Sequence, residues 1–216
     1  MPNGVKIQRL KTMAILAMKS SKADLIPEGA YPARIYQIIH VGTVPGFEGQ
    51  LQNKTRITFE FPTEKKVFDE NKGEQPRVLS QAYTLSFGEK ANLRKVINAC
   101  DPKGLKTDVV GFVSYDIENL IGKECLITVG QREKKNGEGK YNFVEAVTIL
   151  PKGMECPAQI NPSKILNYTK FDWELFKALP EFVRKEIEGS EEFKKLEKPK
   201  EFEYPKEDIK PSEIPF

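Results

Sequence analysis

Residues 86–102 restrict the possible folds more than any other stretch, because they predict one amphipathic helix inside a β-rich region. Ser86 and Glu89 have the spacing of a capping box, whose side chains satisfy free backbone N–H groups at a helix start. Asp101-Pro102 ends the helix, because proline cannot continue its hydrogen bonding. The apolar residues between these limits fall on one helix face, namely Leu93, Val96, Ile97 and Cys100.

Strand patterns stand on both sides of this helix. Lys54–Phe61 alternates apolar with polar residues, which is typical of a half-buried strand. The full set of predicted strands is Tyr31–Val41, Lys54–Phe61 and Val78–Leu85 before the helix, and Cys125–Gln131 and Tyr141–Leu150 after it. We expect the Gly-rich segment Gly42–Asn53 and the polar segment Pro62–Arg77 to be loops.

Three strands, a helix and two strands form the element order of the oligonucleotide/oligosaccharide-binding barrel, the OB-fold. The predicted fold class is therefore mainly β: a five-stranded OB-fold barrel with a helix between strands 3 and 4. We assign the barrel to residues 26–150 and a basic N-terminal arm to residues 1–25.

The character of the chain changes after Pro151. Residues 151–198 read as a proline-containing linker followed by short helices that begin near Asp172, Pro180 and Glu191. Residues 199–216 are rich in Lys, Glu and Pro, a composition that cannot build a core, so we expect a disordered tail.

Several classes of function lack the residues they need. His40 is the only histidine and lies in a predicted strand, no phosphate-binding Gly-Lys-Ser/Thr occurs, and no carboxylate pair stands out. We therefore expect no enzyme, no metal and no cofactor. Cys100, Cys125 and Cys156 lack metal-site spacing, which favours reduced, partly buried thiols in a cytoplasm.

Apolar stretches are too short for a membrane span or a signal peptide. Met13–Met18 is the apolar run nearest the N-terminus, and six residues do not make the core of a signal peptide. No stretch approaches the eighteen apolar residues of a spanning helix.

Charge is distributed unevenly along the chain. Residues 1–150 carry 22 Lys and Arg against 17 Asp and Glu, whereas residues 151–216 carry 12 against 14. Lys6, Arg9, Lys11, Lys19 and Lys22 all precede the first acid. A basic body with an acidic tail suits binding to a polyanion.

The predicted barrel places cations and aromatic rings where OB-folds bind single strands, across strands 2 and 3 and the two loops that flank them. The hairpin between the last two strands carries four cations within ten residues. The same residues are also typical of an ordinary hairpin exposed to water, and each candidate aromatic ring could equally belong to the core. The candidate DNA-binding residues are Arg34, Tyr36, Phe47, Arg56, Thr58, Tyr83, Phe87, Arg132, Lys134, Lys135, Lys140 and Tyr141.

Four short runs carry a resemblance to phage-encoded single-stranded DNA-binding proteins of the OB-fold type. The run Ile26–Arg34 resembles their opening strand, and Leu120–Lys123 resembles their entry into strand 4. Phe171–Glu174 and Leu179–Phe182 resemble the helical segment that follows their barrel. The resemblance covers about residues 26 to 188.

The last residues, Ile214, Pro215 and Phe216, are similar to the end of bacterial single-stranded DNA-binding proteins. In that family the tip recruits replication, repair and recombination enzymes by inserting Phe and its carboxylate into a basic pocket. The resemblance implies the same role here. The tail departs from the family's run of acids, since Lys206 and Lys210 interrupt it.

These observations predict sequence-tolerant binding of single-stranded DNA in phage replication and recombination, in the host cytoplasm, with replication proteins as partners of the tail. Two alternatives remain. One is a virion structural or protein-binding barrel without a nucleic-acid ligand, and the other is an RNA-binding or strand-annealing protein.

Overall fold

The computed structural model describes residues 25–71, 73–111, 113–135, 137 and 139–197, and only the backbone of Phe47 and Asp69. Residues 1–24 of the predicted arm and the predicted tail at 199–216, with Ile214, Pro215 and Phe216, lie outside these residues.

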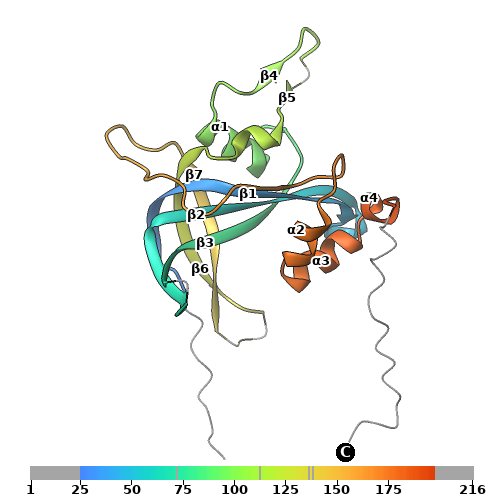
Figure 1. Ribbon diagram of the computed structural model, residues 1–216. Coiled ribbons are helices and arrows are strands. Elements are labelled where there is room, and N and C mark those ends of the chain that lie inside the picture. Colours follow the sequence, from blue (N-terminus) through green and yellow to red (C-terminus); the bar gives the residue numbers. More distant parts are fainter. Residues whose placement is uncertain (1–24, 72, 112, 136, 138, 198–216) are drawn as a thin grey trace, which may run out of the picture.

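A strongly curled antiparallel sheet forms the body of the molecule (Figure 1). The strand order is β3-β2-β1-β6-β7, and a short sixth strand, β8, pairs in parallel with β1. The strands are β1 (Gly29–Pro45), β2 (Leu51–Asp69), β3 (Gly73–Thr84), β6 (Glu124–Glu133), β7 (Lys140–Thr148) and β8 (Lys164–Leu166). The five long strands therefore correspond to the five predicted ones.

Apolar and polar residues alternate along the strands, so the apolar side chains form a core inside the curled sheet. Ile57, Phe59 and Phe61 of β2 are fully buried, as the period-two pattern predicts. They pack with Ile35 of β1 and Ile127 of β6 in one apolar cluster. Within the described residues β3 and β7 are not paired, so the sheet is a half-barrel that stays open between these two strands.

Helix α1 (Asn92–Cys100) covers one end of the curl, and its predicted stripe is confirmed by buried Leu93, Val96 and Ile97. The predicted capping box is wrong. The helix begins five residues later than expected, after Ala91, which gives no side-chain cap. Ser86 belongs instead to the turn that leaves β3, where its hydroxyl accepts from the Gly88 N–H at 3.5 Å.

The two predicted loops on either side of Lys54–Phe61 are largely strand. Pairing continues to Pro45 and Leu51, with only the 3-10 turn η1 (Phe47–Gly49) and its neighbours between the strands. On the other side, Lys65–Val67 pairs with Glu74–Pro76 beyond an irregularity after Phe61. Polar side chains are compatible with these arms because an antiparallel sheet can face water on one side.

Smaller elements fill the segment between α1 and β6. A ribbon of β4 (Lys106–Thr107) and β5 (Val113–Ser114) projects beyond α1, and η2 (Ile117–Leu120) leads into β6 (Figure 1). The Tyr115 hydroxyl donates to Asp101 Oδ2 at 2.9 Å and ties the base of the ribbon to the end of α1.

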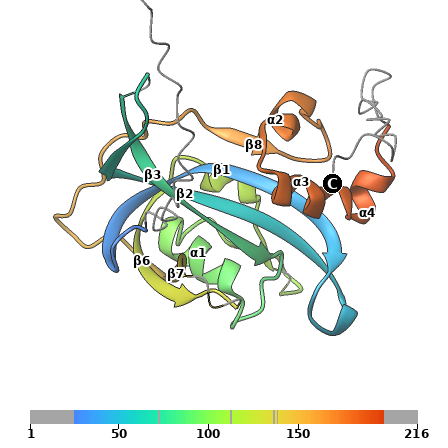
Figure 2. The same ribbon diagram turned by 90° about the horizontal axis from the view of Figure 1, so that it is seen from below.

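The C-terminal helices pack on the outer side of β1 and form a second core there. They are α2 (Trp173–Ala178), α3 (Glu181–Glu188) and α4 (Glu191–Lys194), and Figure 2 shows them beside β1 and β2. The second core contains Ile39, Val41 and Val44 of β1 with Phe176, Ile187 and Phe193 of the helices. β1 therefore contributes to both cores, which makes the predicted appendage part of the packed body.

Side chains cap two of these helices, both of which begin where the sequence predicts. Asp172 accepts from the Leu175 N–H at 2.9 Å, and Ser190 accepts from the Phe193 N–H at 3.2 Å. Glu192 fixes α4 to β1 by accepting from the Thr43 N–H and hydroxyl. Burial opposes ionisation of Glu192, but these two hydrogen bonds, together with one from its own backbone N–H and the charge of His40, lower the pKa of the carboxyl.

The structure describes all three cysteines as free thiols, with Cys125 and Cys156 buried and Cys100 partly so. The part of the chain that the structure describes contains no helix long and apolar enough to cross a membrane.

Candidate nucleic-acid interface

The structure does not bring the predicted residues of β1 and β2 together on an open channel. Arg34 extends along the outside of β1, but its hydrogen-bonding groups are directed at the protein. Its Nε donates to the Pro157 carbonyl at 2.7 Å, and Nη2 donates to the Cys156 carbonyl and to Glu124, both at 2.8 Å. Arg34 thus anchors the segment that follows β7.

Arg56 and Thr58 point outward from β2, as predicted, and the chain itself covers them. The Arg56 guanidinium lies 3.2 Å from the Glu186 carboxylate and 5.2 Å from the centre of the Phe182 ring, both on α3. Thr58 is 5% exposed and lies within hydrogen-bonding distance of Gln37 and Ser80. Helix α3 therefore occupies the surface that the sequence assigns to DNA.

Glu60, the next outward residue of β2, holds the linker over the sheet. Its fully buried carboxylate accepts from the backbone N–H groups of Ile160 and Asn161 at 2.6 and 2.7 Å. The Asn161 side-chain amide donates a third hydrogen bond at 2.6 Å. A buried carboxylate needs such donors, so this contact covers the far end of the predicted channel.

Three predicted aromatic residues are partly or fully enclosed. Tyr83 is 7% exposed and belongs to the inner core, where burial raises the pKa of its phenol. Phe87 packs against the same core. Tyr36 is half-buried on β1, and burial is the main cause of its raised phenol pKa, with the negative charge of Glu60 second. The side chain of Phe47 lies outside the described residues.

The β6–β7 hairpin is where predicted cations and rings meet on an accessible surface. Arg132 and Tyr141 are directly opposite each other in the ladder, so they share a face, and Tyr141 is 42% exposed. Phe143 lies two positions from Tyr141 on the same face, and the Arg132 guanidinium carbon is 3.9 Å from the centre of its ring. We call Arg132, Tyr141 and Phe143 the hairpin platform.

Gly130 lets the Phe143 ring lie close to the strand. A Cβ atom at position 130 would be only 2.6 Å from a ring carbon of Phe143, so a larger residue would displace the ring. Gly130 is the partner of Phe143 in the ladder, which places this contact on the platform face. The backbone and the guanidinium therefore hold the ring from two sides.

Lys134, Lys135 and Lys140 extend the positive charge to the tip of the hairpin, and all three are exposed. The Lys134 N–H donates to the Gly139 carbonyl at 2.9 Å, and Gly137 and Gly139 have φ values of 71° and 88°, which favour glycine. The exposed Glu133 opposes Lys140 in the ladder and reduces the net charge.

Phe143 was missed by the sequence analysis, although the sequence contained the signal. Tyr141 and Phe143 are two residues apart in a predicted strand, so their side chains must lie on one face. Because an aromatic residue in a strand is more often a core residue, the pair formed by Tyr141 and Phe143 was not recognised. Only the contact with Arg132 distinguishes Phe143 from a core ring.

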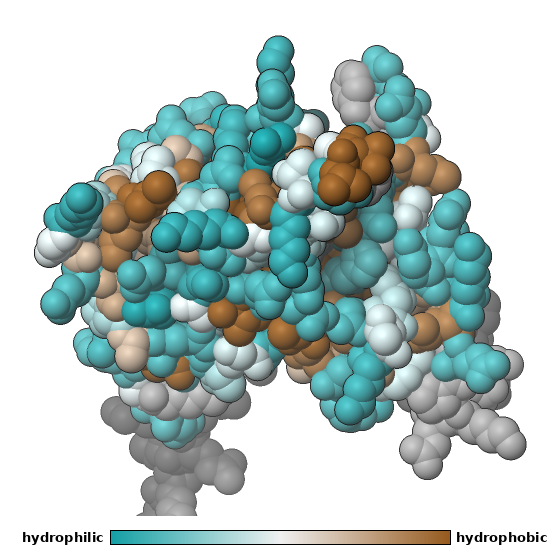
Figure 3. Space-filling model, turned by 90° about the horizontal axis from the view of Figure 1, so that it is seen from above, coloured by the Kyte–Doolittle hydropathy of each residue, from teal (hydrophilic) through white to brown (hydrophobic). Residues whose placement is uncertain are grey.

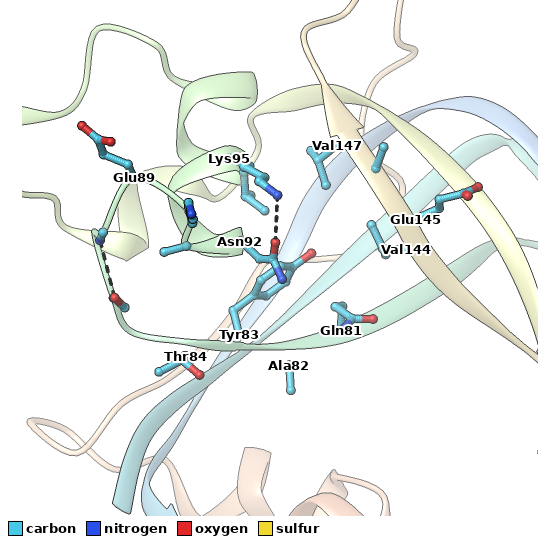
Figure 4. A pocket seen from close by; sticks show the side chains of 16 residues that line it. Gln81, Ala82, Tyr83, Thr84, Glu89, Asn92, Lys95, Val144, Glu145 and Val147 are labelled. Carbon is cyan, nitrogen blue, oxygen red and sulfur yellow. Dashed lines mark hydrogen bonds between the residues drawn. The ribbon is translucent and has the colours of Figure 1, made fainter. Parts of the chain in front are cut away.

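A cavity of about 970 Å³ opens between the unpaired strands β3 and β7 (Figure 4). Gln81 and Tyr83 of β3 face Val144 and Val147 of β7 across it. Lys95 of α1 lies at its rim and donates to Asn92 at 3.2 Å. β7 therefore carries the hairpin platform at one end and a wall of this cavity at the other.

Exposed apolar side chains form separate patches within a mostly hydrophilic surface, as the view from above shows (Figure 3). Val109 and Val110, between β4 and β5, are the most exposed of the large apolar residues described. Phe68 and Val67 are exposed on the β2–β3 arm, and Phe182 on α3.

Comparisons with protein-family models and with curated proteins find no match for the chain.

Proposed function

We propose that the half-barrel is an OB-fold and that the chain binds single-stranded DNA without sequence preference through the β6–β7 hairpin. The observation that carries the proposal is the hairpin platform. The Arg132 guanidinium lies 3.9 Å from the centre of the Phe143 ring, and Arg132 is directly opposite the exposed Tyr141 in the ladder. Bases stack on such rings whatever their identity, and nearby cations neutralise phosphates.

The position of the hairpin supports this assignment. In an OB-fold the loop between the last two strands flanks the binding groove, and here that loop carries Lys134, Lys135 and Lys140. The proposed site is narrower than the one expected from sequence, because α3 and the linker cover the outer face of β1 and β2. The biological setting that we propose, phage DNA replication and recombination in a host cytoplasm, rests on the resemblance alone.

Salt dependence tests the electrostatic part of the proposal. If Arg132 and the three hairpin lysines each neutralise one phosphate, the logarithm of the affinity should fall with the logarithm of salt with a slope of about −3. The measurement is fluorescence anisotropy of labelled oligo-dT at several salt concentrations, with duplex of the same length as the control. A slope near zero, or duplex binding as tight as single-strand binding, would contradict it.

The tail supplies a second prediction. We propose that Ile214, Pro215 and Phe216 recruit replication proteins and take no direct part in DNA binding. Removing residues 199–216 should leave the affinity for oligo-dT unchanged or raise it, because the tail is mildly acidic. The same truncation, and Phe216→Ala alone, should abolish retention of host replication proteins on the immobilised chain. Retention that is the same with and without the tail would disprove this role.

One observation favours the protein-binding alternative. Val109 and Val110 are almost fully exposed at the end of a ribbon, and water-exposed apolar pairs are common at protein contacts. This alternative predicts no binding of oligo-dT at any salt concentration. The RNA-binding alternative is separated by comparing DNA and RNA strands of matched sequence, since only RNA offers the 2′-hydroxyl.

A further inference from the structure

The cavity between β3 and β7 contains a buried hydrogen-bond donor without an acceptor. Tyr83 lines the cavity and is 7% exposed, and its hydroxyl has no hydrogen-bond partner among the described residues. Figure 4 shows its ring extending from β3 toward Asn92 of α1. Burial raises the pKa of this phenol, so the hydroxyl stays protonated and can donate. Folding has already removed this donor from water, so an acceptor that enters the cavity would satisfy it.

The rest of the lining suits a polar but uncharged molecule. Val96, Val144 and Val147 supply apolar surface, and Gln81 and Asn92 add amide groups that both donate and accept. The charged side chains of the lining balance each other, with two acids and two lysines, namely Glu89, Glu145, Lys90 and Lys95. At about 970 Å³ the cavity is within the size range of small-molecule sites, so it has room for a planar heterocycle.

The cavity adjoins the hairpin platform along β7. Phe143 belongs to the platform, and the next residue, Val144, belongs to the cavity wall. Side chains of consecutive strand residues point to opposite faces, so the two sites lie on either side of β7. Among the described residues β7 ends the ladder, and no strand pairs with its free edge. A nucleic-acid strand can therefore pass over this edge and place neighbouring bases in the two sites.

We propose that this cavity is a second subsite for single-stranded DNA and takes one base, next to the base that stacks on the hairpin platform. The edge of the base accepts a hydrogen bond from the Tyr83 hydroxyl, and its faces contact the valines, as in pockets that hold an unstacked base. Thymine offers the carbonyl oxygens O2 and O4 as acceptors. The inference rests on the proposed function, because the platform delivers the strand to the cavity.

Tyr83→Phe tests the hydrogen bond, because it removes the hydroxyl and keeps the ring. We expect the affinity for oligo-dT, measured by anisotropy at constant salt, to fall about three- to tenfold, the usual contribution of one hydrogen bond. Stability toward denaturant should stay the same or rise, because the hydroxyl has no partner among the described residues. The matched control is Tyr115→Phe, because the Tyr115 hydroxyl donates to Asp101, away from the cavity, and its loss should leave the affinity unchanged. Unchanged affinity in Tyr83→Phe, or an equal loss in both variants, would overturn the proposal.

A photo-cross-link locates the bases and separates this inference from the proposed function. The probe is oligo-dT that carries 4-thiothymine, irradiated in complex with the full-length chain. Mass spectrometry should find cross-links to the hairpin platform and also to Gln81, Tyr83 or Val147 in the cavity. Cross-links at the platform alone would overturn the inference and leave the proposed function in place, whereas cross-links at neither site would contradict both.

Discussion

Replacing Arg132 and Tyr141 together by alanine is expected to weaken the binding of oligo-dT about a hundredfold. Loss of one stacked base costs roughly 1–3 kcal/mol, and loss of one phosphate contact adds to it. Both side chains are exposed, and Tyr141 is 42% accessible, so the fold should tolerate the change. Anisotropy of labelled oligo-dT at constant salt measures the effect.

The β2–β3 arm offers a matched control. Lys66 Nζ lies 6.0 Å from the centre of the Phe68 ring, so this arm also presents a cation beside an exposed ring. Lys66→Ala/Phe68→Ala removes the same kinds of group and should leave the affinity within about twofold of the unchanged chain. A similar loss in both variants would mean that binding is not localised to the hairpin platform. No loss in either would exclude the platform as the site.

Glu60→Ala is expected to destabilise the whole body of the molecule by roughly 2–4 kcal/mol. The substitution removes a fully buried charged acceptor of three hydrogen bonds, and hydrogen bonds to charged groups contribute about 1.5–3 kcal/mol each, less where water can replace the acceptor, as at the half-exposed Ile160. It also frees the linker that joins the half-barrel to the C-terminal helices. Denaturant unfolding followed by circular dichroism gives the change in the free energy of unfolding.

Glu124→Ala is the comparison for this effect. Glu124 is likewise a strand carboxylate with a partner, Arg34 at 2.8 Å, but its side chain is 47% exposed. Ion pairs that water reaches contribute less than about 1 kcal/mol, so this variant should be close to the unchanged chain. If Glu60→Ala cost no more than Glu124→Ala, the linker would be held mainly by other contacts.

Local sequence patterns were sufficient to predict the buried face of an element where that element packs on a single core. The alternation of Ile57, Phe59 and Phe61 predicted the inward face of β2, and the stripe from Leu93 predicted the buried face of α1. The predicted starts near Asp172, Pro180 and Glu191 agree with those of α2, α3 and α4, because helix-start preferences act within a few residues. The Ser86 box failed because a turn continues from β3 to Ala91 and delays the first helical residue.

The outward residues of β2 show what a local sequence pattern cannot predict, namely which part of the chain covers them. Arg56 and Glu60 do face away from the inner core, as their spacing predicts. Arg56 contacts Glu186, which is 130 positions away in the chain, and Glu60 contacts Asn161, which is 101 positions away. No local pattern records such a contact, so a surface predicted to be free for a ligand proved to be covered by the chain itself.

The amino-acid sequence by itself determined the five long strands, the central helix, the starts of the C-terminal helices and the basic hairpin, because each depends on neighbours within a few residues. Only the tertiary structure decided that β1 has a core on both sides, that Arg34 and Arg56 hold protein segments, and that β3 and β7 stay unpaired. The physical reason is that accessibility depends on the whole packed chain, since a polar side chain has the same local pattern whether water, a ligand or a distant helix covers it.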